Sequence, residues 1–474
     1  MIKVNFIYKG ESNITLCNIN ENINTIISRL NSEINKMDIN SLELLYKGKI
    51  ININSTILQL LSDEKGKTEN NIIIHVLEQN ESKDNIETIS NKEEDLYIMT
   101  YQIDKNKKYV KILNKDFVNK YKNICKIIYE GKIYDLCEEF CVENKKTKNI
   151  LEIRLNNIEY ITDMSHMFSH CNSLLSFKCY SKINLIKVDN ISHMFYECSL
   201  LSCIDGLSQL NTINVNDMIG VFLGCNRLVN LSPISDWNIS NVTDSYEMFD
   251  ECSSLSSLEH LSKWNTMNLE DIHRMFEGCS SLISIDGLLN WNTKKVKYMF
   301  GLFEECSSLT NLKGSSKWNT TNVINMSGMF KNCNSLINLN DLSEWNVLNV
   351  TNMSAMFCNC SSLLCINGLS KWKTNNVKKM SYLFQGCYSL SSLDGLSEWN
   401  TSNLIDMFGM CYECRSLSNI NGIAKWNISK LNADSYKIFY KCTSLSYIDS
   451  KYILDNEEIL ADFEECFQCI NIHL

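Results

Sequence analysis

The chain has 474 residues, of which 44% are apolar and 21% are charged, so it holds ample material for a globular core. Its net charge is −10, and no stretch has the basic excess that would offset phosphate charge, which argues against nucleic acid as the main ligand. No apolar run is long enough to span a bilayer, and the start, MIKVNFIYKGESNITL, favours a strand over a secretory signal. We therefore expect a soluble, cytoplasmic protein.

Residues 1–78 have the pattern of a small mixed domain. IKVNFIY and NITLCNI predict two strands, and NINTIISRLNSEI predicts an amphipathic helix. LELLYKGKII then predicts a strand, a turn around Gly48 and another strand, and IIIHVL a closing strand. This ββαββ order, with LLYKGK before a short Leu-rich turn, resembles a ubiquitin-like β-grasp domain over residues 1–78.

That resemblance implies an exposed apolar patch on the sheet, which in such domains is the docking surface for helical partners. By position, the patch would consist of Leu45, Ile73 and His75. The alternative is that these are ordinary sheet residues. The chain departs from the family in lacking a Gly-Gly tail after the last strand, since LEQNESKDN follows. Covalent conjugation to other proteins is therefore not expected.

Two segments separate this domain from the rest of the chain. Residues 79–95 are polar and charged, which is typical of a linker. Residues 96–150 alternate as strands, LYIMTYQI, YVKILN and CKIIYEGKIYDL, with a hairpin signal at Glu130-Gly131. We expect this module to cap the N-terminal end of a repeat array, and the acidic residues 449–474 to cap the other end.

The middle of the chain, residues 151–448, is an internal repeat. A Cys recurs with a constant period of 27 from Cys171 to Cys414, and all eight Trp follow the same period from Trp237 to Trp426. In every unit from Phe168 to Phe384, a Phe stands at the third position before the Cys, and Cys411 then interrupts this column. Repeating units that cannot bury a core alone must stack, each column packing on its own copy.

One unit shows the local structure that this pattern predicts. Met353, Met356, Phe357, Cys360 and Leu363 lie at steps of three and four, which predicts a short helix with one apolar face. The next residues, through Leu369, predict a short strand and a turn at Asn367-Gly368. About eleven such coils, stacked at roughly 4.8 Å, would extend on the order of 50 Å.

Two polar columns predict features of the bends. The Asn after each Trp, as at Asn346, is expected to form an amide ladder from coil to coil, with a solvent-exposed corner as the alternative. The Gly column, as at Gly368, suggests a turn with positive φ. Pro233 occupies the same column, and its ring holds φ in the negative region, so the turn is not of positive φ in every coil.

These motifs bring a family into view. F-x-x-C-x-x-L-x-x-[LI], followed by W-N-T-x-N-V-x-x-M-x-x-M-F, resembles BspA-like leucine-rich repeats, in particular a subgroup described in mycoplasma surface proteins and also found in protists. The resemblance covers residues 151–448 and implies an α/β leucine-rich-repeat solenoid with a parallel sheet along one face. It implies little about a ligand, because such arrays serve both as surface adhesins and as intracellular scaffolds.

The residues that could carry chemistry have simpler explanations. Stacked column cysteines would approach disulfide distance, but they lie on the apolar face, and without an export signal a reduced ladder is expected. Cys411-x-x-Cys414 and Cys466-x-x-Cys469 each match half of a zinc site, with no second pair at ligand spacing, so we expect no metal and no cofactor. His166 and His193 are expected to be a stacked surface pair, and Glu304-Glu305 helix-surface charges.

The sequence thus predicts a protein that is not an enzyme. We expect a non-catalytic adaptor whose ubiquitin-like domain docks one partner while a face of the solenoid binds another. Ubiquitin-pathway components are the candidate class for the first partner. The alternative is a surface or secreted adhesin, exported by a route that the sequence does not show. The oligomeric state, the ligand and the binding face are left open.

Overall fold

The computed structural model describes residues 2–8, 11–17, 42–46, 49–51, 71–78, 97–143, 149–179, 188–432 and 437–445. The chain divides into two compact units, one formed by Met1–Leu96 with Glu130–Lys132 and the other by Tyr97–Tyr129 with Ile133–Leu474. The helix expected from NINTIISRLNSEI and the cap expected at 449–474 lie outside the described residues.

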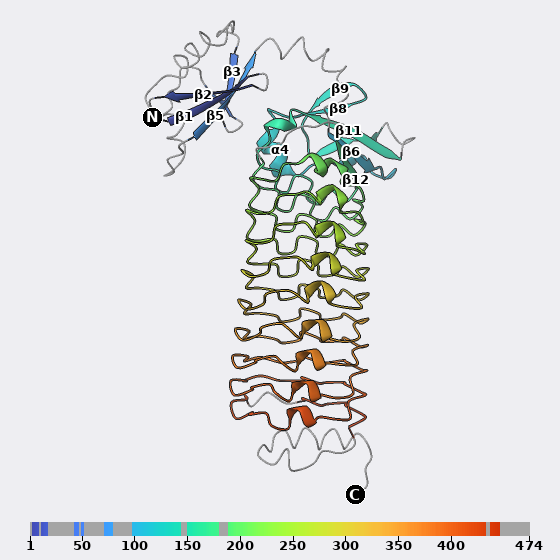
Figure 1. Ribbon diagram of the computed structural model, residues 1–474. Helices are drawn as coiled ribbons and strands as arrows, with labels where there is room; N and C mark the ends of the chain where they lie inside the picture. The colour runs from blue at the N-terminus through green and yellow to red at the C-terminus, as the bar shows by residue number, and fades with distance from the viewer. Residues whose placement is uncertain are drawn as a thin grey trace. The chain divides into compact units, whose positions relative to one another are not determined.

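The first unit contains a five-stranded mixed sheet (Figure 1). Its strands are β1 (Ile2–Tyr8), β2 (Glu11–Cys17), β3 (Leu42–Tyr46), β4 (Lys49–Ile51) and β5 (Asn71–Glu78), in the order β2-β1-β5-β3-β4. The central pair, β1 and β5, is parallel, and the other pairs are antiparallel. The strands predicted from the sequence are therefore present, and the two chain-adjacent hairpins form the two edges of the sheet.

The second unit begins with a sheet that joins the repeat array. Its strands follow the order β12-β6-β11-β8-β9, and a separate pair joins β10 to β7. The elements are β6 (Tyr97–Gln102), β7 (Tyr109–Lys111), α4 (Lys115–Tyr121), β8 (Lys126–Tyr129), β9 (Lys132–Asp135), β10 (Glu139–Cys141), β11 (Ile150–Asn156), the 3₁₀ helix η4 (Ile158–Tyr160) and β12 (Leu174–Cys179).

Strand β12 belongs to the first repeat and at the same time pairs with β6, so the sheet closes the first coil. The Tyr97 ring stacks on Phe177 with centroids 4.9 Å apart, and the Tyr101 hydroxyl donates to the Ile112 carbonyl. These contacts cover apolar side chains of the end coil, and the role of residues 96–150 as an N-terminal cap stays a prediction. The sequence missed α4, whose first turn is capped by the side chain of Asn114.

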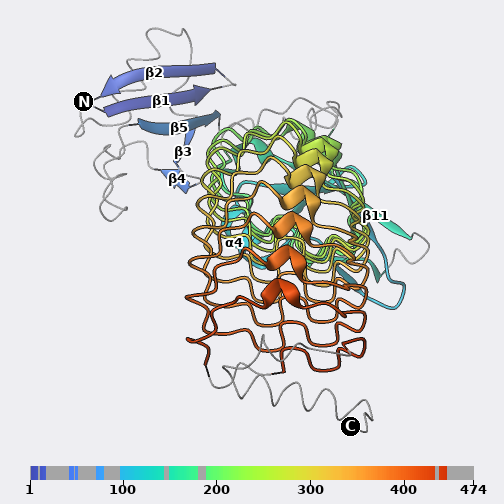
Figure 2. The same ribbon diagram turned by 60° about the horizontal axis from the view of Figure 1, so that its bottom comes forward.

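The array itself consists of coils that stack along the chain, drawn from green to red in Figures 1 and 2. We name each coil by its column cysteine. The helix predicted in each coil is wrong: the M-x-x-M-F-x-x-C segments form successive turns, and each coil from Cys198 to Cys414 carries only a short 3₁₀ helix (η5–η13). These are Asp205–Gln209, Ser232–Ile234, Glu259–Leu261, Asp286–Leu288, Lys313–Ser315, Asn340–Leu342, Asn367–Leu369, Asp394–Leu396 and Asn421–Ile423.

Backbone hydrogen bonds explain why turns replace the helix. In the Cys360 coil, the N–H groups of Ala355 and Phe357 donate to carbonyls of the next coil, whereas Met356 and Cys358 donate within their own coil. An α-helix would use all of these donors internally and leave none for the neighbouring coil. The alternation requires left-handed residues at two positions in each coil, and Ala355 has a φ of 55° there.

The parallel sheet predicted along one face is reduced to single-residue bridges. One column of bridges runs from Asp163 through Asn190 to Asp406, and a second is interrupted, with pairs such as Asn338–Cys365. No continuous strand forms in the described coils 188–432. The expectation of a solenoid of regularly repeated units is confirmed. The described coils 188–432 contain neither the α-helix nor the strand that the α/β class implies.

The interior of the array is a set of identical stacks. The Phe rings from Phe168 to Phe384 lie face to face with centroids 5.3–5.8 Å apart. Each column thiol from Cys198 to Cys414 donates to the Phe carbonyl of the preceding coil, as Cys360 does to Phe330 at 3.2 Å. The cysteines are free and buried, as a reduced ladder requires. Burial also raises the pKa of the column thiols from Cys171 to Cys387, to about 12 at Cys171.

Two polar columns behave differently from their predictions. The side chain of Asn346 accepts from the N–H of Leu348 in its own coil, which is a local turn bond, and its Nδ2 also donates to the Thr321 hydroxyl of the preceding coil at 3.4 Å, so the column does not form an amide-to-amide ladder. The ladder is made further along the coil, where Asn349 donates to the Thr321 carbonyl of the preceding coil. The expected positive φ at the Gly column is also wrong: Gly368 lies outside the left-handed region, and a Cβ there would overlap the Leu339 carbonyl.

Candidate functional site

The outward residues of the stacked turns form what we call the turn face. Because the turns are bonded coil to coil and their apolar residues are buried, side chains at equivalent positions of neighbouring coils lie beside one another. Between the Cys252 and Cys333 coils, this face carries a group of rings and charged residues that we call the acidic–aromatic cluster. It consists of Tyr246, Glu247, Asp250, Asp271, His273, Arg274, Glu277, Phe300, Glu304 and Lys331.

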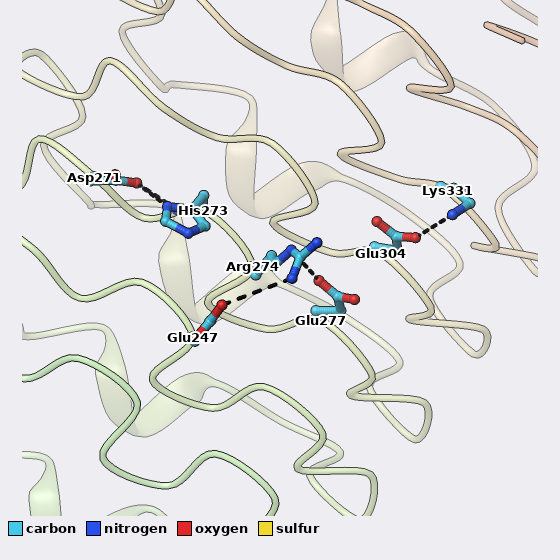
Figure 3. Close-up of polar contacts among 7 residues, drawn as sticks. All are labelled: Glu247, Asp271, His273, Arg274, Glu277, Glu304 and Lys331. Atoms are coloured by element: carbon cyan, nitrogen blue, oxygen red, sulfur yellow. Dashed lines mark hydrogen bonds and ion pairs between the residues drawn. The ribbon is translucent and has the colours of Figure 1, made fainter. Parts of the chain in front are cut away.

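Three rings of the cluster form a stack. His273 lies between Tyr246 and Phe300, with ring centroids 4.5 Å and 4.2 Å away and nearly parallel planes. The carboxylate of Asp271 fixes the imidazole, since its Oδ1 lies 2.7 Å from Nδ1 and also accepts from the backbone N–H of His273 (Figure 3). The stack therefore presents a ridge of aromatic edges whose orientation is set before any partner arrives.

A column of carboxyl groups runs beside the rings. Asp250, Glu277 and Glu304 occupy the same position in three successive coils, and Lys331 follows in the fourth. Lys331 Nζ lies 2.6 Å from Glu304 Oε1, so this end of the column is neutralised (Figure 3). At the other end, Asp250 has the carboxylates of Glu277, Glu247 and Glu251 for neighbours.

Arg274 lies at this acidic end of the column and contacts two carboxylates. Arg274 Nε lies 3.2 Å from Glu277 Oε2, and Arg274 Nη1 lies 3.9 Å from Glu247 Oε1 (Figure 3). Neither contact is a hydrogen bond, and Glu277 Oε2 is buried without a hydrogen-bond partner among the described residues. The cluster therefore contains more carboxylate than its cations satisfy.

The raised pKa values of Asp250 and Glu277 reflect this excess of carboxylates over cations. Burial, followed by repulsion from Glu277, Glu247 and Glu251, raises the pKa of Asp250 to about 8, against the weaker attraction of Arg274. Burial and the adjacent Glu304 raise the pKa of Glu277 to about 7. Near neutral pH, the folded array thus holds protons on carboxyl groups that would be ionised in the unfolded chain.

The arrangement is suited to binding a cation. A Lys or Arg side chain placed against Asp250 and Glu277 would supply the missing positive charge, and the neighbouring ring edges would contact its aliphatic stem. Glu304, expected to be a helix-surface charge, instead lies on a turn and pairs with Lys331. The sequence missed this site. Comparing the outward positions from one repeat to the next would have aligned Asp250, Glu277 and Glu304.

The two histidines that share a column were expected to stack at the surface, and they do. The rings of His166 and His193 lie 4.8 Å apart and nearly parallel, with His166 exposed and His193 half-buried. Burial, and secondarily His166, lowers the pKa of His193. Among the described residues, no group of three or more His, Cys, Asp or Glu side chains is arranged to hold a metal ion.

The three residues predicted as a docking patch lie on two neighbouring strands of the first sheet. Leu45 of β3 is directly opposite His75 of β5, and Ile73 precedes His75 by two positions. Directly opposed residues and residues two apart share a face of a sheet, so the backbone places all three on one face. Their role in binding stays a prediction.

The stacked coils place the second unit in the class of repeat solenoids. Comparison with protein families then identifies the repeat: the model described as "Mycoplasma protein of unknown function, DUF285" matches residues 139–202, 162–284, 255–341, 281–370 and 335–452. These overlapping matches cover more than half of the chain, so the protein belongs to this family. A search of the curated proteins finds no match. Within the described residues, no helix has the length and apolar character needed to cross a membrane.

Proposed function

We propose that the protein is a non-catalytic scaffold for protein–protein interaction, in which the repeat array binds a partner through the acidic–aromatic cluster. The observation that carries this proposal is the buried Oε2 of Glu277, which accepts no hydrogen bond from the described residues, in a column with Asp250, whose pKa is raised to about 8 by burial and by its acidic neighbours. Polar groups in this condition reduce the stability of the array, and a cationic partner would remove the cost. The partner site is therefore a segment bearing Lys or Arg.

The N-terminal unit is the second docking module of this scaffold. A mixed sheet with a parallel central pair and a hairpin at each edge supports a ubiquitin-like β-grasp domain. The shared face of Leu45, Ile73 and His75 supports the apolar patch of such domains as its contact surface. Components of the ubiquitin pathway are the partner class that follows from this proposal. Joining two modules in one chain would raise the effective concentration of one partner near the other.

The thiol ladder supports a reducing compartment. The column cysteines from Cys171 to Cys414 form no disulfide and are buried in the core, and burial raises the pKa of those such as Cys171 and Cys279. Such thiols persist in the cytoplasm, where disulfides are rare. We therefore assign the scaffold to the cytoplasm as part of the proposal.

A quantitative pull-down from native lysate tests the two modules separately. The baits are the full chain, a cluster variant (Asp250→Asn with Glu277→Gln) and a sheet variant (Leu45→Ala with Ile73→Ala). Each variant should lose a different set of partners. The control is Glu398→Gln, an exposed carboxyl on another column of the array, which should recover the wild-type set.

Two outcomes would contradict the proposal. If the cluster variant recovers every partner of the wild type, the acidic–aromatic cluster is not the binding site. If the partners of intact cells are outer-surface proteins and protease treatment of those cells cleaves the protein, the adhesin alternative replaces the cytoplasmic scaffold.

A further inference from the structure

A second surface of the array has the opposite character to the acidic–aromatic cluster. It is formed by the outward residues of the C-x-x-L-x-x-[LI] segments, and we call it the neutral face. In the eight segments from Cys225 to Ile420, the only charged residues are Arg227 and Arg415. The rest of the outward positions are mostly Ser, Thr and Asn. In a chain of net charge −10, a face with so few charges lets two copies approach with little electrostatic repulsion.

A column of exposed aliphatic side chains runs along the middle of the neutral face. Val229, Ile283, Ile337 and Leu364 occupy one position of four coils and are 46–58% exposed. The coils between them carry Ser256 and Thr310 at the same position. Large and small side chains therefore alternate from the Cys225 coil to the Cys333 coil. Exposed apolar groups in such a row mark an interaction surface, and the alternation is a knob-and-hole pattern.

We propose that the neutral face binds a second copy of this chain, antiparallel to the first, with the two-fold axis between Ile283 and Thr310. This inference goes beyond the proposed function, because it concerns another face and another partner. An isologous contact brings the same patch of both copies together, so each coil opposes the coil at equal distance across the axis. The Cys279 coil then faces the Cys306 coil of the second copy.

In this register the aliphatic column is complementary to itself. Ile283 lies against Thr310 of the second copy, and Ile337 lies against its Ser256. Val229 meets Leu364 at both ends of the contact, which places an apolar pair there. A parallel arrangement about an axis along the column would instead place Ile283 on Ile283 and Ser256 on Ser256. In the antiparallel register, Ile283 and Ile337 each face a smaller side chain of the second copy, and this is why we choose it.

Charges at the border of the face agree with the same register. The exposed column next to the neutral face carries Asp286 in the Cys279 coil and Lys313 in the Cys306 coil. Across the axis, Asp286 faces Lys313 of the second copy, and symmetry forms this pair twice. On the opposite border, Glu305 faces Gly278 and Glu251 faces Asn332, so no carboxylates oppose each other there. One unfavourable pair, Asp205 with Asp394, falls at the outer end.

The area is adequate for a specific dimer. Eight coils at roughly 4.8 Å give a length of about 40 Å, and an extended segment of five to six residues gives a width of about 15–20 Å. The face therefore offers on the order of 700 Å² per copy. A standard specific interface buries about 800 Å² per partner, so the neutral face is within the range of a stable, moderately tight dimer.

Analytical ultracentrifugation of the full chain tests the dimer. The wild type should show a concentration-dependent dimer, and Ile283→Lys should weaken it by at least about 100-fold, because a charge is then buried twice against Thr310. Met267→Lys is the matched control: Met267 is 46% exposed on a different column, so this variant should dimerise as the wild type does. A monomeric wild type, or equal weakening by both variants, would overturn the proposal.

A charge exchange tests the register without disturbing the fold. Asp286→Lys alone and Lys313→Asp alone each create two like-charge pairs across the axis and should weaken the dimer by about 10-fold. The double variant restores opposite charges and should return to within about threefold of the wild type. If the double variant weakens the dimer by the combined effect of the two single variants, the antiparallel register is wrong. The cluster variant (Asp250→Asn with Glu277→Gln) should dimerise normally, which separates this proposal from the scaffold function.

Discussion

Removing one carboxylate from the acidic–aromatic cluster should stabilise the array above pH 4, by an amount that grows until about pH 8. Asp250 has its pKa raised from 3.8 to about 8, so the folded state holds a proton that the unfolded chain releases above pH 4. The linked loss of stability begins as pH rises through the unfolded value near 4 and is complete above pH 8. Asp250→Asn keeps the shape of the neutral acid and cannot ionise. It should therefore match the wild type at pH 4 and exceed it at pH 9.

The size of the gain follows from the displacement of the pKa. A rise of the Asp250 pKa from 3.8 to about 8 corresponds to about 5–6 kcal/mol at roughly 1.4 kcal/mol per pH unit. Asp250 is only half-buried, and solvent together with the relaxation of its acidic neighbours screens much of this, so we expect about 2 kcal/mol. Because a repeat array does not unfold in one step, the suitable assay is the protection of coil amides against hydrogen exchange, compared between pH 4 and pH 9.

The matched control has the opposite sign. Lys297 Nζ lies 2.6 Å from Glu270 Oε2, and this pair lowers the pKa of Glu270. The pair stabilises the array above the unfolded pKa of Glu270, and this stabilisation is lost as pH falls through the lowered value. Glu270→Gln should therefore slightly destabilise the same coils at pH 9. Equal stabilisation by Asp250→Asn at both pH values, or none at pH 9, would refute the argument for a strained carboxyl group.

Three substitutions test the packing of the coils, each by the change in hydrogen-exchange protection of the amides in the substituted coil and its neighbours. Gly368→Ala should destabilise by about 2–3 kcal/mol, because the added methyl meets a carbonyl of the preceding coil; a neutral effect would mean that the coils separate easily. Trp372→Phe should cost about 1–2 kcal/mol, since the indole N–H donates to the Leu342 carbonyl at 3.0 Å. Cys279→Ala should cost about 1–2 kcal/mol, and the wild-type thiol should resist iodoacetamide until the chain unfolds; rapid labelling of the native protein would contradict its burial.

The repeat was predictable because its period lies in buried residues. Phe357, Cys360 and Trp372 recur at fixed intervals, and only a stack of coils can bury every copy. The helix was wrongly predicted because steps of three and four also describe a chain of tight turns that places Met353, Met356 and Phe357 inward. What separates the two structures is the left-handed φ at Ala355 and Asn359. Ala does not signal this conformation, but Asn359 and the Gly residues that occupy the same two columns at Gly328 and Gly386 do, and the periodicity of the apolar residues was given more weight than they were.

The candidate site was harder to predict for a related reason. Its residues are outward, where no single column has a constant residue type, and the acidic column changes from Asp250 to Glu304 and then to Lys331. Its properties arise between coils: the raised pKa of Asp250 depends first on burial and then on Glu277, which belongs to the next coil. A sequence pattern gives the register of these residues, but the degree of burial that makes their charges costly comes from the packed structure.

Inward and outward residues of a coil have different roles, and this explains why the unfavourable burial of the Asp250 carboxyl points to function. The coils are joined by backbone hydrogen bonds and by buried groups such as the thiol of Cys279, so outward side chains are not needed for stacking. At the position of Asp250, other coils carry Ser169 or Gln385 without disturbing the repeat. Asp250 therefore places a carboxyl group that is costly to ionise at a position where a neutral residue would be more stable. Such departures are expected where a surface must bind, and in the function that we propose a partner supplies the cation that relieves the strain.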